Sequence, residues 1–149
     1  DRNAGFSTAN PGRLYVPPSQ DPVYGYQAVN VEAQRDTTNS LLNWTRTMLA
    51  VRRRHDAFAV GSFRELGGSN PSALTYVREL DGDTVLCVNN LSRFPQPIEL
   101  NLQHWNGYTP VELTGQVEFP RIGELPYLLT LPGHGFYWFS LRAPVGEEP

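Results

Sequence analysis

The spacing of the apolar residues changes at Phe58, and this change constrains the fold of the 149-residue chain more than any other feature. Between Leu41 and Val51, apolar residues recur at steps of three and four, which predicts an amphipathic helix of about four turns. After Phe58, short apolar or alternating runs are bounded by turn residues, which predicts short β-strands. The sequence therefore predicts one helix followed by a mainly β domain.

The residues around the expected helix fit its polarity. Candidate N-terminal caps precede it, and a basic cluster at its end complements the negative end of the helix dipole. An apolar stripe that includes Trp44 and Met48 cannot be buried by the helix alone, so the helix is expected to pack on another surface. The cap candidates are Asp36, Thr38, Asn39 and Ser40, and the basic residues are Arg52, Arg53, Arg54 and His55.

The part of the chain after Phe58 predicts an antiparallel β-sandwich of about seven strands. Asp81-Gly82 is a strong hairpin signal between two of them. The run Val85-Leu86-Cys87-Val88 is apolar throughout, which is typical of a central strand that is covered on both faces. The expected strands are 62–66, 73–80, 84–89, 96–102, 110–113, 128–131 and 135–141.

The first 36 residues are rich in proline and glycine and show no periodicity, so they predict one long irregular segment. A loop of this length usually belongs to a binding site or rests on another surface. The loop-like opening at Asp1 is expected of a part cut from a longer polypeptide.

Composition and charge exclude several classes of function. The net charge of −3 and the pI of about 5.6 give no basic face for nucleic acid, and the run Arg52-Arg53-Arg54 is better explained by the helix end. No apolar stretch is long enough to cross a membrane. A single cysteine, Cys87, is expected to be a buried, inert thiol, which favours a reducing, cytoplasmic compartment.

Candidate chemical groups are scattered along the chain. His55, His104 and His134 are far apart with no cysteine nearby, so no metal ligand is expected. The carboxylates stand in helix caps and hairpin turns, where they serve local structure, and no catalytic residue is assigned. Trp105 and Tyr108 are candidates to stack on sugar rings, although packing in a core or an interface is the favoured reading of both.

Several stretches resemble a known family. The segment Asp1–Ser7 is similar to a loop of α-glucosidase-type members of the α-amylase superfamily. The run from Asp21 to Gln34 resembles the trehalose synthase family specifically, nearest to its actinobacterial form. The similarity continues through Leu41-Leu42-Asn43-Trp44, Arg52-Arg53-Arg54-His55, Asn89–Phe94 and Gly133–Trp138, and so covers essentially the whole chain.

The resemblance implies a division of the chain and a reaction. Residues 1–58 would be the last βα loop region and the final helix of a (β/α)₈ barrel, and residues 59–149 a C-terminal β-sandwich. The family interconverts maltose and trehalose through a covalent glucosyl-enzyme, using carboxylates on earlier barrel strands. In this chain only Arg2 and Asn3 are expected to border the acceptor side of the substrate pocket, with Phe6 packing the loop.

The resemblance also implies partners. These are the remainder of the barrel, maltose and trehalose, further copies of the same chain in a homo-oligomer, and a maltokinase. Calcium, where the family binds it, is expected upstream, and no cofactor is expected in this segment.

Three further expectations stay open. The segment is expected to be inactive alone. Hydrolysis by an α-glucosidase or α-amylase of the same superfamily is the enzymatic alternative. A glucan-binding or assembly module is the non-catalytic one.

Overall fold

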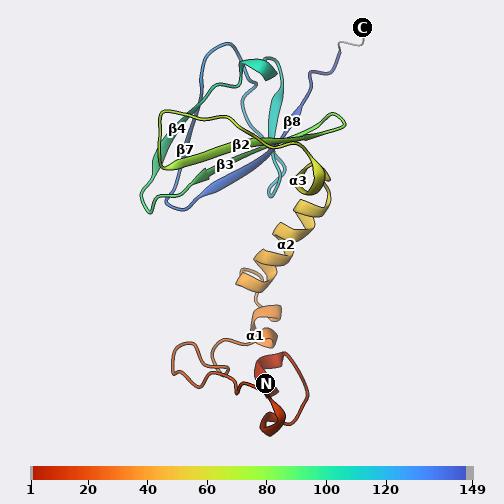
Figure 1. Ribbon diagram of the computed structural model, residues 1–149, viewed down its shortest axis with the longest axis vertical. Coiled ribbons are helices and arrows are strands. Elements are labelled where there is room, and N and C mark those ends of the chain that lie inside the picture. The colour runs from red at the N-terminus through yellow and green to blue at the C-terminus, as the bar shows by residue number, and fades with distance from the viewer. Residues whose placement is uncertain (1, 147–149) are drawn as a thin grey trace. The chain divides into compact units, whose positions relative to one another are not determined.

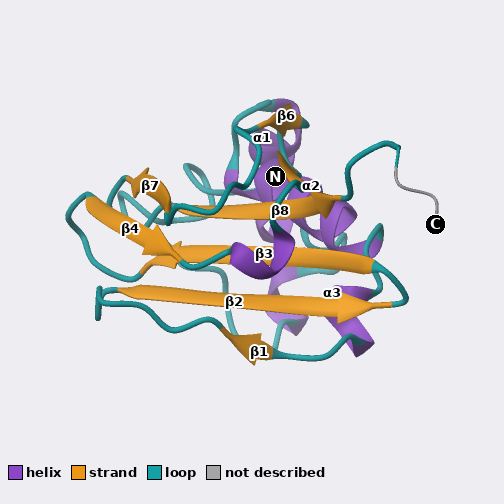
Figure 2. Ribbon diagram, turned by 90° about the horizontal axis from the view of Figure 1, so that it is seen from above, coloured by secondary structure: helices purple, strands orange, loops and turns teal. Residues whose placement is uncertain are grey.

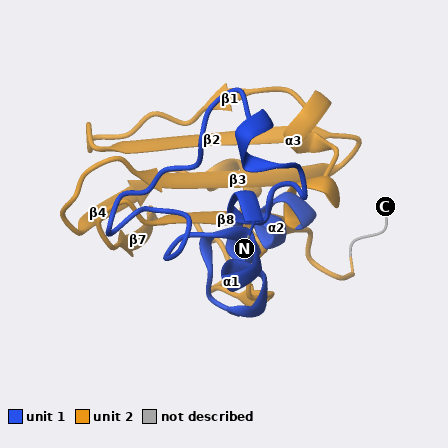
Figure 3. Ribbon diagram, turned by 90° about the horizontal axis from the view of Figure 1, so that it is seen from below, with its two compact units in different colours: residues 1–50 blue, residues 51–149 orange. Residues whose placement is uncertain are grey.

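The computed structural model describes residues 2–146 and divides the chain into two compact units, Asp1–Ala50 and Val51–Pro149. Figure 3 colours the two units separately. The division falls inside a helix, whereas the sequence predicts a domain boundary between residues 58 and 59. That boundary separates a barrel from a sandwich, and it stays a prediction.

The first unit contains more regular structure than the sequence predicts. Two short 3₁₀ helices, η1 (Arg2–Gly5) and η2 (Pro11–Arg13), precede the α-helix α1 (Val31–Asp36). The side-chain oxygen of Asn30 accepts a hydrogen bond from the backbone N–H of Ala33 at 2.8 Å, which caps α1. The prediction of a wholly irregular segment is therefore wrong, because a helix of six residues is too short to show a period.

The predicted long helix is confirmed as α2 (Leu41–Arg53). Ser40 is its N-terminal cap, since its hydroxyl accepts a hydrogen bond from the backbone N–H of Asn43 at 3.1 Å. After α2 comes one more turn of helix, α3 (Ala57–Val60), which the sequence does not predict. The Arg52 guanidinium donates to the Phe58 carbonyl at 3.3 Å and lies over the Phe58 ring, so it joins the end of α2 to α3.

The second unit is the predicted antiparallel β-sandwich (Figures 1 and 2). A six-stranded sheet has the order β1-β2-β3-β8-β5-β6, and β4 pairs with β7 in a second sheet. All seven predicted strands are present. The additional one, β6, has only two residues and therefore no readable pattern. The bounds are β1 (Arg64–Glu65), β2 (Ala73–Leu80), β3 (Asp83–Asn90), β4 (Gln96–Leu100), β5 (Thr109–Glu112), β6 (Val117–Glu118), β7 (Tyr127–Leu131) and β8 (Phe136–Arg142), with a 3₁₀ turn η3 (Gln103–Trp105).

The hairpin between β2 and β3 forms where the sequence predicts it. Leu80 pairs with Asp83, and the two residues between them have positive φ angles, 48° at Asp81 and 85° at Gly82. This geometry suits Asp-Gly because aspartate tolerates the left-handed region and glycine has no side chain to clash.

The central strand β3 has a core on each of its faces. Leu86 and Val88 pack with residues of β4 and β7 in the core between the two sheets. Val85 and Cys87 face the other way, toward Val51 and the helix α3. The prediction that this run is covered on both sides is confirmed.

Cys87 and the turn before β8 also agree with the sequence analysis. The Cys87 thiol has no exposed surface, and burial raises its pKa to about 11, so it remains protonated at neutral pH.

His134 occupies the turn before β8 with a φ of 55°, and its backbone N–H donates to the Ser92 carbonyl at 2.8 Å. Among residues 2–146, no helix has the length and apolar character that crossing a membrane requires.

Candidate functional site

The predicted substrate-contact residues Arg2 and Asn3 begin η1, and the left-handed part of this turn starts at Asn3. Within η1, the φ angles are 55° at Asn3, 56° at Ala4 and 77° at Gly5. An alanine in this region is strained, because its Cβ approaches the backbone, and such strain occurs where the surrounding structure or a function requires it. Arg2 is exposed and Asn3 is buried.

The side chain of Asn3 organises the loop that follows. Its amide nitrogen donates to the Ser7 hydroxyl at 2.9 Å and to the carbonyls of Ser7 and Ala9 at 3.2 and 2.8 Å. These acceptors fix the orientation of the amide, because the flipped form would place its oxygen against two carbonyls. The Asn3 oxygen is buried and has no hydrogen-bond partner among the described residues. In this unit the Asn3 side chain therefore holds the loop from Ser7 to Ala9 in place.

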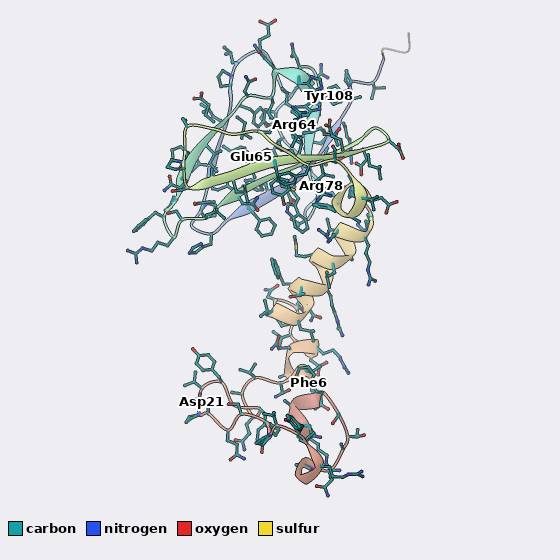
Figure 4. The ribbon with its side chains drawn as sticks, viewed as in Figure 1. Phe6, Asp21, Arg64, Glu65, Arg78 and Tyr108 are labelled. Carbon is teal, nitrogen blue, oxygen red and sulfur yellow. The ribbon has the colours of Figure 1, made fainter. Side chains whose placement is uncertain are left out.

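A cavity of about 350 Å³ lies beside this turn. Asn3, Phe6 and Ser7 form part of its lining, and Tyr24 and Tyr26 come from the following loop. Phe6, labelled in Figure 4, is 83% exposed. The packing of the loop by Phe6 in the complete enzyme stays a prediction. The sequence gives no signal for the two tyrosines as site residues, because they stand in a segment without periodicity.

The loop that carries Tyr24 is held by Asp21 (labelled in Figure 4). The Asp21 carboxylate accepts hydrogen bonds from the backbone N–H groups of Tyr24 and Val23, both at 2.8 Å, and these bonds lower its pKa. A Cβ on Gly25 would lie 2.2 Å from the Asp21 carbonyl oxygen, so the turn needs glycine there. A second, polar cavity of about 360 Å³ lies along the same turn.

The first unit has almost no core of its own. Among residues 2–50, Met48 is the one buried hydrophobic side chain. Many large apolar side chains of the same unit are exposed, which is more than an isolated folded domain usually shows. Exposed apolar surface of this extent is typical of an interface. The exposed residues are Phe6, Tyr15, Val16, Val23, Tyr24, Val29, Leu41, Trp44 and Leu49.

The two aromatic residues considered for sugar stacking lie in the sandwich. Trp105 is 3% exposed and belongs to the core between the sheets, and the Arg64 guanidinium covers its ring at 5.1 Å. Tyr108 is half-buried against the same core (Arg64 and Tyr108 are labelled in Figure 4). Packing, the favoured reading, is confirmed for both, and Trp105 presents no face on which a sugar could stack.

The candidate chemical groups of the second unit serve local structure. The His55 ring nitrogen lies 3.0 Å from the Asp83 carboxylate, and this contact connects the segment between α2 and α3 to the start of β3. Glu79 pairs with Arg64 at 3.6 Å. Within residues 2–146, no three histidine, cysteine or acidic side chains gather as a metal ion would require.

Residues 63–138, most of the sandwich, match the family described as "Maltogenic Amylase, C-terminal domain". The chain belongs to this family. Its sheets, its core and the strand β8 all fall within or next to the matched range. The predicted site residues Arg2 and Asn3 lie outside the matched range, so their role stays a prediction.

Some individual proteins are similar to this chain over nearly its whole length, including the first unit. The chain is 82% identical to the trehalose synthase/amylase of Mycobacterium tuberculosis, over 100% of this chain and 26% of that protein. It is 64% identical to the trehalose synthase of Pimelobacter sp., over 97% of this chain and 26% of that protein. The chain thus spans about a quarter of the length of these relatives.

A solved structure gives the same result for the fold. The trehalulose synthase of Pseudomonas mesoacidophila matches 95% of this chain and 24% of its own, with a TM-score of 0.64 and 25% sequence identity. The described fold is therefore one that this trehalulose synthase contains as a part of a longer chain.

Proposed function

We propose that the chain is the C-terminal part of a trehalose synthase, an isomerase that interconverts maltose and trehalose. The observation that carries this proposal is the 82% identity over the whole chain with the mycobacterial trehalose synthase/amylase. The exposed apolar surface of the first unit supports it, because three quarters of such an enzyme lie outside this chain and can supply the missing partner surface. We expect the (β/α)₈ barrel to cover this exposed surface.

The reaction follows the retaining pathway of two displacements. A carboxylate of the barrel attacks the anomeric carbon of the non-reducing glucose of maltose, while a carboxylic acid protonates the leaving oxygen. The released glucose turns and attacks the glucosyl-enzyme through its own anomeric hydroxyl, which gives trehalose. The site must exclude water, because water at the same step gives hydrolysis. This chain contributes a wall of the acceptor side and no catalytic group.

The first test is product analysis on maltose. We expect the full-length enzyme to form trehalose and the 149-residue chain alone to show no turnover, since the chemistry needs two carboxylates about 5 Å apart that lie on the barrel. Nuclear magnetic resonance of the reaction mixtures measures both. Glucose as the sole product of the full-length enzyme would remove the isomerase assignment, and turnover by the purified chain would remove the structural role.

The roles of Arg2 and Asn3 at the substrate are part of this proposal. In the full-length enzyme we expect Arg2→Ala to raise KM for maltose about tenfold, the effect of losing one hydrogen bond from a charged donor. The exposed Arg13 of the same unit supplies the control, Arg13→Ala. If steady-state kinetics give both variants the same KM, Arg2 makes no contact with the sugar.

A second candidate function is hydrolysis of α-glucosides by the same intermediate. The mycobacterial relative carries both activities in its name, trehalose synthase/amylase, which favours keeping this candidate. The ratio of glucose to trehalose in the product analysis separates the two.

The remaining elements of the proposal concern location and assembly. They are a homo-oligomer of the full-length enzyme, a maltokinase as a partner, calcium held by the barrel, and a cytoplasmic location. An assembly role for the sandwich is compatible with all of them. The mass of the native particle, with and without a maltokinase, tests the first two.

A further inference from the structure

The C-terminal end of α1 meets the N-terminal end of α2 within the first unit (Figure 1). A helix leaves carbonyl groups at its C-terminal end and N–H groups at its N-terminal end without partners inside the helix. Here the side chains near each helix end supply partners for the other helix. This α1–α2 junction consists of Gln34, Arg35, Thr37, Ser40, Leu42 and Asn43.

Asn43 makes most of the contacts from the side of α2. Its side-chain nitrogen donates to the carbonyls of Gln34 at 3.2 Å, Arg35 at 3.0 Å and Thr37 at 2.9 Å. The hydroxyl of Ser40, which is buried, donates to the Gln34 carbonyl as well. Asn43 is half-buried, so the loss of its donor would leave carbonyls that water reaches poorly. The junction therefore requires a hydrogen-bond donor at position 43.

Gln34 makes the contact in the opposite direction. Its side-chain oxygen accepts a hydrogen bond from the backbone N–H of Leu42 at 3.0 Å. Leu42 is the second residue of α2, so its N–H has no partner inside the helix. The junction therefore requires an acceptor at position 34, and negative charge is favourable there because it faces the positive end of the helix dipole.

The helix α1 also contacts η1, the turn that contains Arg2 and Asn3. A Cβ on Gly5 of this turn would lie 3.1 Å from the Cβ of Val31 and 3.4 Å from the backbone nitrogen of Glu32, so the two segments touch there. Because α1 has six residues, it is only about 9 Å long. A small tilt of α1 at the junction therefore displaces η1 at its other end.

We propose that Asn43 is a positioning residue for the reaction, which acts through α1 to hold η1 where Arg2 and Asn3 reach the acceptor sugar. This proposal rests on the proposed function, because the sugar contact of η1 is part of that function. A displacement of about 1 Å in such a contact can cost about a hundredfold in rate. It also admits water to the pocket, and water at the glucosyl-enzyme gives hydrolysis.

The test compares variants of the full-length enzyme on maltose. We expect Asn43→Asp to raise KM about tenfold and to increase the share of glucose in the products, because a carboxylate cannot donate and is repelled by the three carbonyls. The helix α2 itself is not weakened, since an acidic residue suits its first turn. Steady-state kinetics and nuclear magnetic resonance of the products measure both effects.

Gln34→Glu is the matched control, because it makes the same exchange of an amide for a carboxylate in the same junction. It keeps the oxygen that accepts from the Leu42 N–H. We expect its KM and product ratio to equal those of the unchanged enzyme. Asn43→Ala, which removes the donor without adding a charge, is expected to raise KM about fivefold and serves if Asn43→Asp does not fold.

A merely structural role for Asn43 would give a different result. Partial unfolding reduces the amount of active enzyme, so it lowers kcat and leaves KM and the product ratio unchanged. That pattern, or equal KM values for the Asn43 variants and Gln34→Glu, overturns the proposal. If the unchanged enzyme forms no trehalose from maltose, the proposed function fails instead, and this result is obtained before any variant is compared.

Discussion

Gly133→Ala is expected to destabilise the sandwich by about 3 kcal/mol or more, because a new methyl group would occupy space that backbone atoms already fill. A Cβ at Gly133 would lie 2.1 Å from the Arg93 carbonyl oxygen and 2.6 Å from its carbon. The turn cannot move away easily, since the next residue, His134, donates to the Ser92 carbonyl at 2.8 Å. Urea unfolding followed by tryptophan fluorescence measures the change.

Gly123→Ala is the matched control for this prediction. Its Cβ would meet no atom within 4 Å and its φ angle lies outside the left-handed region, so the change should alter stability by less than about 1 kcal/mol. Equal unfolding midpoints for the two variants would show that the two segments do not approach each other as described.

Phe139→Ala is expected to cost about 4 kcal/mol, the usual effect of a cavity left by a buried phenylalanine. Phe139 has no exposed surface and lies in the middle of β8, next to the central strand. Its ring centroid is 4.9 Å from that of Phe119 and 5.3 Å from that of Tyr137, so its loss also removes two aromatic contacts. The same urea experiment measures the loss.

Phe94→Ala provides the control for Phe139→Ala. Phe94 is 58% exposed and its ring is covered only in part, by the Arg93 guanidinium at 4.8 Å, so its removal should cost about 1 kcal/mol or less. If Phe139→Ala lowers the free energy of unfolding as little as Phe94→Ala does, the Phe139 side chain is not buried between the two sheets, and the described core is wrong.

The elements that the sequence predicts well are those with a long or distinctive local pattern. The helix α2 shows a helical period over most of its length, and the hairpin at Asp81-Gly82 has the residues that its turn requires. The elements that it does not predict are too short for a pattern. They are α1, α3 and β6, and their ends are fixed by contacts such as the Asn30 cap.

The candidate site is predicted less completely than the fold. Arg2 and Asn3 are proposed from family resemblance, and the left-handed turn and the bracing bonds of Asn3 appear only in three dimensions. Contacts between segments far apart in the chain are also not predictable from the sequence. The ring centroids of Phe119 and Tyr137 lie 5.3 Å apart only because the connection before β7 folds over β8.

By itself, the sequence determined that this chain holds one amphipathic helix and an antiparallel sandwich with a strand buried on both faces. These features follow from the period of apolar residues, which is a local property. The tertiary structure alone decided that Trp105 is covered by Arg64, that Phe6 is exposed, and that the ring of Phe119 packs against Phe139. Exposure depends on which distant segments pack against a residue, and no local pattern contains that information.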